Sequence, residues 1–239
     1  MVPKYKRILL KLSGESLMGD KNFGFDNDVI AQYANDIKQL TVIGVEVAIV
    51  IGGGNIYRGT NEAETGIERA HGDYMGMLAT VINGMALQAG LEKIGVYTRL
   101  LSAIKMEQIA EPYIRRRAIR HVEKGRVVIF GAGTGNPYFT TDTAGSLRAI
   151  EINASVILKG TRVDGIYSAD PARDSNASLY HHLTYQEALE KELGVMDLSA
   201  FCQCRDHQLA IRVFNVNKPG ILLRIIQGSD EGTIENSRS

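Results

Sequence analysis

The stretch from Phe130 to Asp142, Phe-Gly-Ala-Gly-Thr-Gly-Asn-Pro-Tyr-Phe-Thr-Thr-Asp, limits what this chain can fold into more than any other. It follows the apolar run Val127–Ile129, which predicts a buried strand of a parallel sheet, and leads into Thr143–Ile150, which predicts a helix. The glycines let the backbone approach a ligand closely, and the Thr-Thr-Asp triplet falls where a helix N-terminus leaves amide N–H groups free. The stretch therefore predicts a site for a phosphate or carboxylate of a small ligand.

Two other interpretations of this stretch are weaker. Thr141 or Asp142 could act only as a helix cap, but capping does not require three glycines upstream. A Rossmann dinucleotide fingerprint needs G-x-G-x-x-G, and Asn136 stands where its last glycine should be. The next apolar run also ends in Lys159, where that fingerprint wants an acidic residue, so dinucleotide binding is disfavoured.

Composition excludes several classes of partner. The chain has 239 residues, enough for one large α/β domain or two closely packed lobes, and 44% of them are apolar. Its 27 basic residues balance its 27 acidic ones, so no overall field draws it toward nucleic acid or a membrane surface. Cys202 and Cys204 have no further residues to join them in a metal site. With neither a signal-peptide core nor a membrane-length apolar run, the sequence predicts a cytoplasmic protein.

Two more strands end in chemistry-bearing residues. The strand Ile8–Leu12 is interrupted by Lys11, which either projects into a site or is a snorkelling edge-strand lysine; the residue alone does not decide. The strand Val45–Ile51 runs into Gly52-Gly53-Gly54, which puts bare backbone at the sheet edge where α/β ligands bind. Arg58 then offers a planar cation suited to phosphate oxygens, the alternative being an exposed loop arginine.

The remaining segments carry weaker signals. A long helix after Gly72 has Met77 and Met85 at helical spacing, which we interpret as core filler, while Asp73 is either a cap or an acceptor for ligand hydroxyls. The arginine-rich helix that Glu111-Pro112 is predicted to open is interpreted as a solvated face rather than a polyanion site.

Helical patterns alternate with short apolar strands along the whole chain. This predicts an α/β fold, a three-layer sandwich whose mostly parallel central sheet is covered by helices on both faces. We expect one domain over 1–239, divided loosely near Gly125 into an N-terminal lobe, 1–125, with phosphate-acceptor features and a C-terminal lobe, 126–239, with nucleotide-binding loops. Glycine-rich loops, cations and a helix N-terminus at one sheet edge suit several phosphate groups, yet the P-loop and protein-kinase motifs are missing.

Five motifs in this order resemble the bacterial uridylate (UMP) kinases, a family of the amino-acid-kinase superfamily: Lys11–Glu15, Gly52–Asn55, Gly72–Asp73, Gly133–Asp142 and Thr161–Pro171. The resemblance runs from about Lys4 to about Thr233, and the Gly-Thr-Gly-Asn-Pro run separates the chain from acetylglutamate, aspartate and carbamate kinases. It implies transfer of the γ-phosphoryl group of Mg-ATP to UMP, giving UDP and ADP in pyrimidine nucleotide biosynthesis.

The resemblance also implies a set of site residues. Matched positions expected to bind ATP are Lys11, Leu12, Ser13, Gly14, Gly54, Arg58, Thr161, Tyr167 and Asp170. Those expected to bind UMP are Gly53, Asp73, Thr134, Gly135, Asn136, Pro137, Tyr138, Phe139, Thr140 and Thr141. Lys11 and Lys159 would neutralise charge on the transferring group, and Asp142 would orient them. Phosphates and water would hold Mg²⁺, so we expect no dedicated metal site in the protein.

Members of this family are typically homohexamers, and many are activated by GTP and inhibited by UTP. Gln88 and Glu92 stand where GTP-responsive members tend to carry basic residues, whereas Arg99 and Arg126 match, so the resemblance leaves the GTP response open.

Two functions other than UMP phosphorylation fit parts of the sequence. A catalytically silent nucleotide-sensing regulator would keep the UMP pocket, but it has no need of Lys11, Arg58 and Asp142. A related kinase could act on a small carboxylate or carbamate, but the bulky segment Asn136–Phe139 suits a base better than a small acid.

Overall fold

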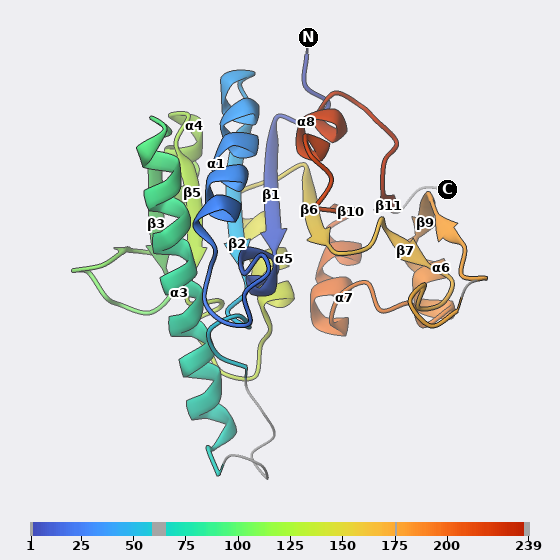
Figure 1. Ribbon diagram of the computed structural model, residues 1–239, viewed down its shortest axis with the longest axis horizontal. Coiled ribbons are helices and arrows are strands. Elements are labelled where there is room, and N and C mark those ends of the chain that lie inside the picture. Colours follow the sequence, from blue (N-terminus) through green and yellow to red (C-terminus); the bar gives the residue numbers. More distant parts are fainter. Residues whose placement is uncertain (1, 59–65, 175, 237–239) are drawn as a thin grey trace.

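The chain folds around one nine-stranded sheet with helices on both faces (Figure 1). This computed structural model describes residues 2–58, 66–174 and 176–236. Within the nine-stranded sheet, every neighbouring pair of strands is parallel except β10 and β11, which confirms the predicted α/β sandwich with a mostly parallel sheet. From one edge to the other, the strands are β4 (Glu111–Pro112), β3 (Thr98–Ser102), β5 (Val127–Gly131), β2 (Glu46–Ile51), β1 (Arg7–Leu12), β6 (Val156–Thr161), β10 (Ala210–Asn215), β11 (Thr233–Asn236) and β9 (His182–Thr184).

The two helical layers explain why the central strands are apolar on both sides. Leu9 and Leu10 point to opposite faces of β1, and neither is exposed, because each face packs against its own helices. One layer consists of α1 (Asn27–Val42), α3 (Arg69–Lys93) and α8 (Ile221–Ile226). The other consists of α4 (Arg115–Glu123), α5 (Thr141–Glu151), α6 (Tyr185–Glu190) and α7 (Leu198–Asp206).

The shortest strands were not predicted from the sequence. Glu111-Pro112 does not open a helix: it forms edge strand β4, where a proline is tolerated, and α4 begins at Arg115. Strands β9 and β11, and the separate hairpin of β7 (Ile166–Tyr167) and β8 (Leu179–Tyr180), have two to four residues each. Such runs are too short to show a hydrophobic period.

The long helix α3 is only half buried. Met77 is 6% exposed, as expected of core filler, but Met85 is 46% exposed, so that part of the prediction was wrong. Leu78 and Ile82 are exposed in the same way. The apolar residues of α3 therefore occupy two faces, one against the sheet and one against solvent in the isolated chain.

Candidate active site

Two lysines lie side by side on neighbouring central strands. The parallel register of β1 and β6 pairs Lys11 with Lys159, and Leu9 with Ile157, so both lysine side chains lie on the face covered by α5. Each lysine side chain is 13% exposed. Because an unpaired buried ion costs several kcal/mol, this arrangement requires a counter-charge. It also rules out the interpretation of Lys11 as an edge-strand lysine.

Asp142, in the first turn of α5, supplies that charge. Its Oδ1 forms an ion pair with the Lys11 ammonium at 2.6 Å, and its Oδ2 accepts a hydrogen bond from Lys159 Nζ at 2.9 Å. Burial opposes ionisation of this carboxylate, but the two ammonium groups together hold its pKa below the ordinary value. Burial, and then the charge of Lys11, lower the pKa of Lys159. The three predicted catalytic residues therefore form one buried cluster.

The N-terminus of α5 is capped by Thr140, not by Thr141 or Asp142. Thr140 Oγ1 accepts from the backbone N–H of Asp142 at 3.0 Å and of Thr143 at 3.3 Å, and it donates to Asp197. Asp197 also accepts from Thr143 Oγ1 at 2.9 Å and caps α7. Since Thr140 does the capping, the Asp142 carboxylate is free to face the lysines.

The glycines beside Lys11 allow close approach of three backbone segments. A Cβ on Gly14 would lie 2.6 Å from the carbonyl oxygen of Gly52, and one on Gly53 would lie 2.7 Å from that of Gly76 on α3. Asn83 of α3 donates to the Gly52 carbonyl oxygen at 2.7 Å and exchanges side-chain hydrogen bonds with Asn55. These glycines are thus required by packing as well as by any ligand. The Asn55–Asn83 pair was not predicted, because nothing in a helical pattern marks a buried amide.

The loop from Ala132 to Tyr138 is held in a strained shape. Ala132, Gly133, Gly135 and Tyr138 all have positive φ, at 61°, 56°, 82° and 72°. For residues other than glycine this conformation costs on the order of 1–3 kcal/mol and persists only when neighbours enforce it. Such strain is concentrated at functional sites, which agrees with the predicted ligand loop.

Two side chains of α3 hold this loop. Thr80 Oγ1 accepts from Ala132 N at 2.8 Å, and Asp73 Oδ2 accepts from Tyr138 N at 2.7 Å. Asp73 also lies 3.3 Å from Arg69 Nε, and α3 has no side-chain cap, so the capping alternative for Asp73 does not hold. In this structure Asp73 is a hydrogen-bond acceptor for protein backbone.

The other residues predicted to bind UMP lie in this loop or directly after it. Tyr138 and Phe139 are exposed, at 66% and 51%. Thr134 bonds locally with Asn136. Pro137 is half-buried, and Thr141 lies beside Gly52.

A cleft of about 520 Å³ adjoins the C-terminal end of β6. It is lined by Lys159 and by three predicted ATP-binding residues, Thr161, Tyr167 and Asp170. Thr161 is the last residue of β6, Tyr167 lies in β7 and Asp170 in the segment between β7 and β8, so the fold brings the three together. The cleft runs from the buried lysine to an aromatic ring on which a base could stack.

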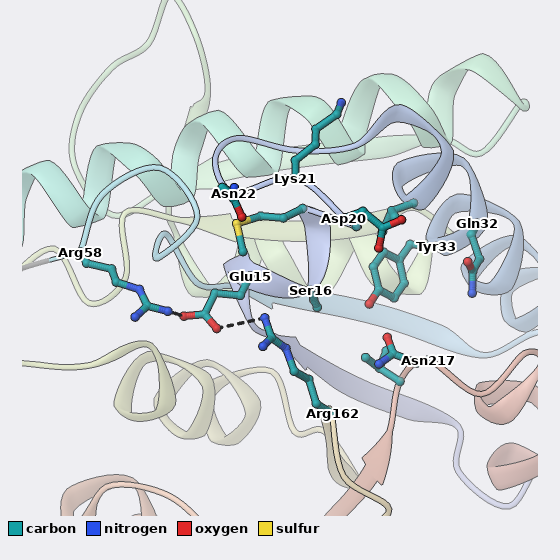
Figure 2. A pocket seen from close by; sticks show the side chains of 14 residues that line it. Glu15, Ser16, Asp20, Lys21, Asn22, Gln32, Tyr33, Arg58, Arg162 and Asn217 are labelled. Carbon is teal, nitrogen blue, oxygen red and sulfur yellow. Dashed lines mark hydrogen bonds and ion pairs between the residues drawn. The ribbon is translucent and has the colours of Figure 1, made fainter.

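A second cleft, of about 590 Å³, is lined by Glu15, Arg58 and Arg162 (Figure 2). Glu15 accepts from Arg58 and, at 3.3 Å, from Arg162, so the predicted ATP-binding cation Arg58 is paired with a carboxylate. Gly54 lies beside the Glu15 and Arg58 side chains. Ser13 caps the short 3-10 helix Gly14–Leu17, and the side chain of Leu12 lies in the core, so at Leu12 only the backbone is available to a nucleotide.

The described residues hold no group of three or more His, Cys, Asp or Glu side chains that could bind a metal ion. Both oxygens of Asp142 already face ammonium groups. This donor set fits a Mg²⁺ ion that arrives on a nucleotide, with phosphate oxygens and water as ligands. Within the same described ranges, no helix is both long and apolar enough to cross a membrane.

Comparison with known proteins gives a consistent family. Residues 6–215 match the model of the amino acid kinase family. A uridylate kinase of Pseudomonas putida is 56% identical over 97% of this chain and 94% of its own length, and one of Salinibacter ruber is 58% identical over 96% and 88%. The crystal structure of a UMP kinase from Bacillus anthracis superposes with a TM-score of 0.95 at 40% identity, covering 98% of this chain and 97% of that one.

Proposed function

The chain belongs to the amino acid kinase family and, within it, to the uridylate kinases, and from that premise we propose that it transfers the γ-phosphoryl group of Mg-ATP to UMP. The products would be UDP and ADP, in pyrimidine nucleotide biosynthesis. The observation that carries the proposal is the buried Lys11–Asp142–Lys159 cluster, which lies between the cleft at the end of β6 and the N-terminus of α5. Phosphoryl transfer needs positioning and charge neutralisation more than covalent chemistry, and this cluster offers both.

In the proposed mechanism the two ammonium groups neutralise the oxygens of the transferring phosphoryl group. Asp142 holds Lys11 and Lys159 in place, and the N-terminal amides of α5 add positive potential on the acceptor side. Mg²⁺, arriving as the ATP complex, would neutralise the leaving phosphates. No general base is required of the protein, because the UMP phosphate is already ionised at neutral pH.

We assign the two substrates to opposite sides of this cluster. The cleft with Thr161, Tyr167 and Asp170 would take the adenosine of ATP, with Lys11 to Gly14, Gly54 and Arg58 near its phosphates. Gly53, Asp73 and the loop 134–141 would take UMP. The site thus draws on both lobes, 1–125 and 126–239, of what we propose is one domain, since a single sheet runs through both.

The test is UDP formation from Mg-ATP, with UMP, CMP, dUMP, acetylglutamate and carbamate offered separately as acceptors. We expect turnover with UMP and none with the carboxylate or carbamate. Tight UMP binding without turnover of any acceptor would favour the nucleotide-sensing regulator. Turnover of acetylglutamate or carbamate in place of UMP would favour the third candidate.

We propose a homohexamer in the cytoplasm, as the family resemblance implies. The exposed apolar face of α3 supports burial against another copy: its members are each between 41% and 49% exposed, namely Tyr74, Met75, Leu78, Ile82 and Met85. Light scattering of the purified protein tests the assembly.

We further propose that GTP activates this enzyme weakly or not at all. UTP, the inhibitor that the family resemblance implies, is tested in the same assay. Arg99 Nε already lies 3.3 Å from Glu111, and Gln88 donates to Glu92 at 3.1 Å, so carboxylates occupy the region a triphosphate would need. The same assay with and without GTP or UTP tests this.

A further inference from the structure

Arg148 of α5 is a buried cation outside the lysine cluster. It is 5% exposed, and its guanidinium lies 3.8 Å from the ring centroid of Tyr113, stacked upon it. Its Nη1 donates to Glu151 Oε2 at 2.6 Å, and Tyr113 Oη donates to the same oxygen at 2.5 Å. The side chains of Tyr113 and Glu151 therefore fix the plane of this guanidinium, which leaves little freedom to its remaining donors.

One of those donors reaches the strained acceptor loop. Arg148 Nη2 donates to the carbonyl oxygen of Gly133 at 3.4 Å. Gly133 lies between Ala132 and Thr134, in the part of the loop with positive φ. Thr80 holds this turn from the α3 side, so Arg148 holds it from the opposite, α5 side.

The surroundings of Tyr113 anchor the network to rigid elements. Tyr113 N donates to the Ser102 carbonyl oxygen at the end of β3, and its ring meets Phe130 of β5 edge-on, with centroids 5.6 Å apart. Phe130 lies two residues before Ala132, where the strained loop begins. The network thus joins the end of β5, the turn and the helix that carries Asp142.

We propose that Arg148 is a positioning residue for the acceptor nucleotide: clamped by Tyr113 and Glu151, it fixes the Gly133 carbonyl and so the shape of the loop that receives UMP. It does not touch the transferring group. This inference rests on the proposed UMP kinase activity and deepens it, since it predicts which substrate's binding depends on a residue behind the site.

The test is a kinetic comparison of Arg148→Lys with the wild-type enzyme. Lysine keeps the charge but loses the stacked plane and the second donor, so the KM for UMP should rise about tenfold. The KM for ATP and kcat should stay within about twofold, because the lysine cluster and the β6 cleft are untouched. Direct UMP binding by calorimetry should weaken by the same factor.

Two further variants keep the test decisive. Glu151→Gln leaves Arg148 stacked but weakens its clamp, so the KM for UMP should rise about threefold; this variant substitutes for Arg148→Lys should the latter not fold. Tyr113→Phe keeps the ring and removes one hydroxyl, and should change the UMP KM less than either.

The outcomes separate the two proposals. Wild-type enzyme that does not phosphorylate UMP overturns the proposed function. Active wild type, with an Arg148→Lys variant whose two KM values are unchanged or rise equally, overturns the positioning role, and so does a variant that loses only thermal stability.

Discussion

Two buried carboxyl groups on the same face of the central sheet differ in charge: Asp142 is ionised, and Glu235 is mostly protonated at neutral pH. Asp142 faces two ammonium groups, which hold its pKa below the ordinary value and keep it ionised. Glu235 on β11 is fully buried, and neither of its oxygens has a hydrogen-bond partner in the described part of the chain. Burial raises the pKa of Glu235 to about 8, and the charge of Lys159 offsets this only in part. A counter-charge, more than burial, therefore decides whether a carboxylate here is charged.

The largest expected effect comes from removing the paired carboxylate with Asp142→Asn. Lys11 and Lys159 would then be buried together without a counter-charge, which should lower the unfolding free energy by about 3–5 kcal/mol. Turnover should fall by about a thousandfold, because the cations lose their fixed positions.

The pH dependence of this variant gives a sharper check. Burial already lowers the pKa of Lys159, so without Asp142 this lysine should release its proton readily. The stability deficit measured by denaturant titration should therefore shrink as the pH rises above neutral. A deficit of equal size at every pH would contradict the proposed electrostatic balance.

Lys11→Met tests one cation of the same cluster. It removes positive charge needed in the transition state, so kcat should fall by about 10²–10³-fold while UMP affinity changes little. Lys6→Met, on an exposed residue next to the same strand, is the matched control and should behave as wild type. Near-normal turnover in Lys11→Met would remove Lys11 from the mechanism.

Glu235→Gln tests the unpaired carboxylate. Because the pKa is about 8 in the folded protein and 4.5 ordinarily, the folded state binds the extra proton, and stability must fall as the pH rises through this window. The groups facing it are Lys159, Tyr185 and the Cys204 thiol, whose own pKa burial raises to about 12. The variant should gain roughly 3 kcal/mol on wild type between pH 5 and pH 8.

Glu231→Gln is the matched control for this measurement. Glu231 pairs with Arg224, and the hydrogen bond from that arginine lowers its pKa, so its stabilising effect is present at neutral pH and lost on acidification. Its stability deficit relative to wild type should therefore be present and constant at neutral pH, and should disappear on acidification. Parallel pH profiles for the two variants would show that Glu235 is not the group responsible.

The smallest effect is expected at the exposed cleft. Glu15→Gln breaks the pairs with Arg58 and Arg162, whose side chains are each 66% exposed, and should change stability by less than about 1 kcal/mol. Glu46→Gln breaks the pair with Arg7, in which both side chains are 13% exposed, and should cost more. Equal losses in thermal unfolding would show that exposure does not separate these pairs.

Local sequence patterns predicted the structure best at the turn between a strand and the helix that follows it. The strand, glycine turn and helix from Val127 to Ile150 were predicted with nearly the observed boundaries, because glycine and threonine act through their own backbone. The N-cap of α5 shows the limit of such patterns: the capping alternative named Thr141 or Asp142, whereas Thr140 caps the helix in the structure. Which of several capping residues is used depends on Asp197, 57 residues away along the chain.

By itself, the sequence determined the α/β class, the glycine-rich loops and the residue types that phosphoryl transfer requires. The tertiary structure alone decided that Lys11 stands beside Lys159, that Asp142 separates their charges, and that Arg148 reaches Gly133. It also decided that neither side-chain oxygen of Glu235 has a hydrogen-bond partner among the described residues. The reason is physical: propensity and turn chemistry act over a few residues, whereas charge pairing and burial depend on strand register and helix packing between segments distant in sequence.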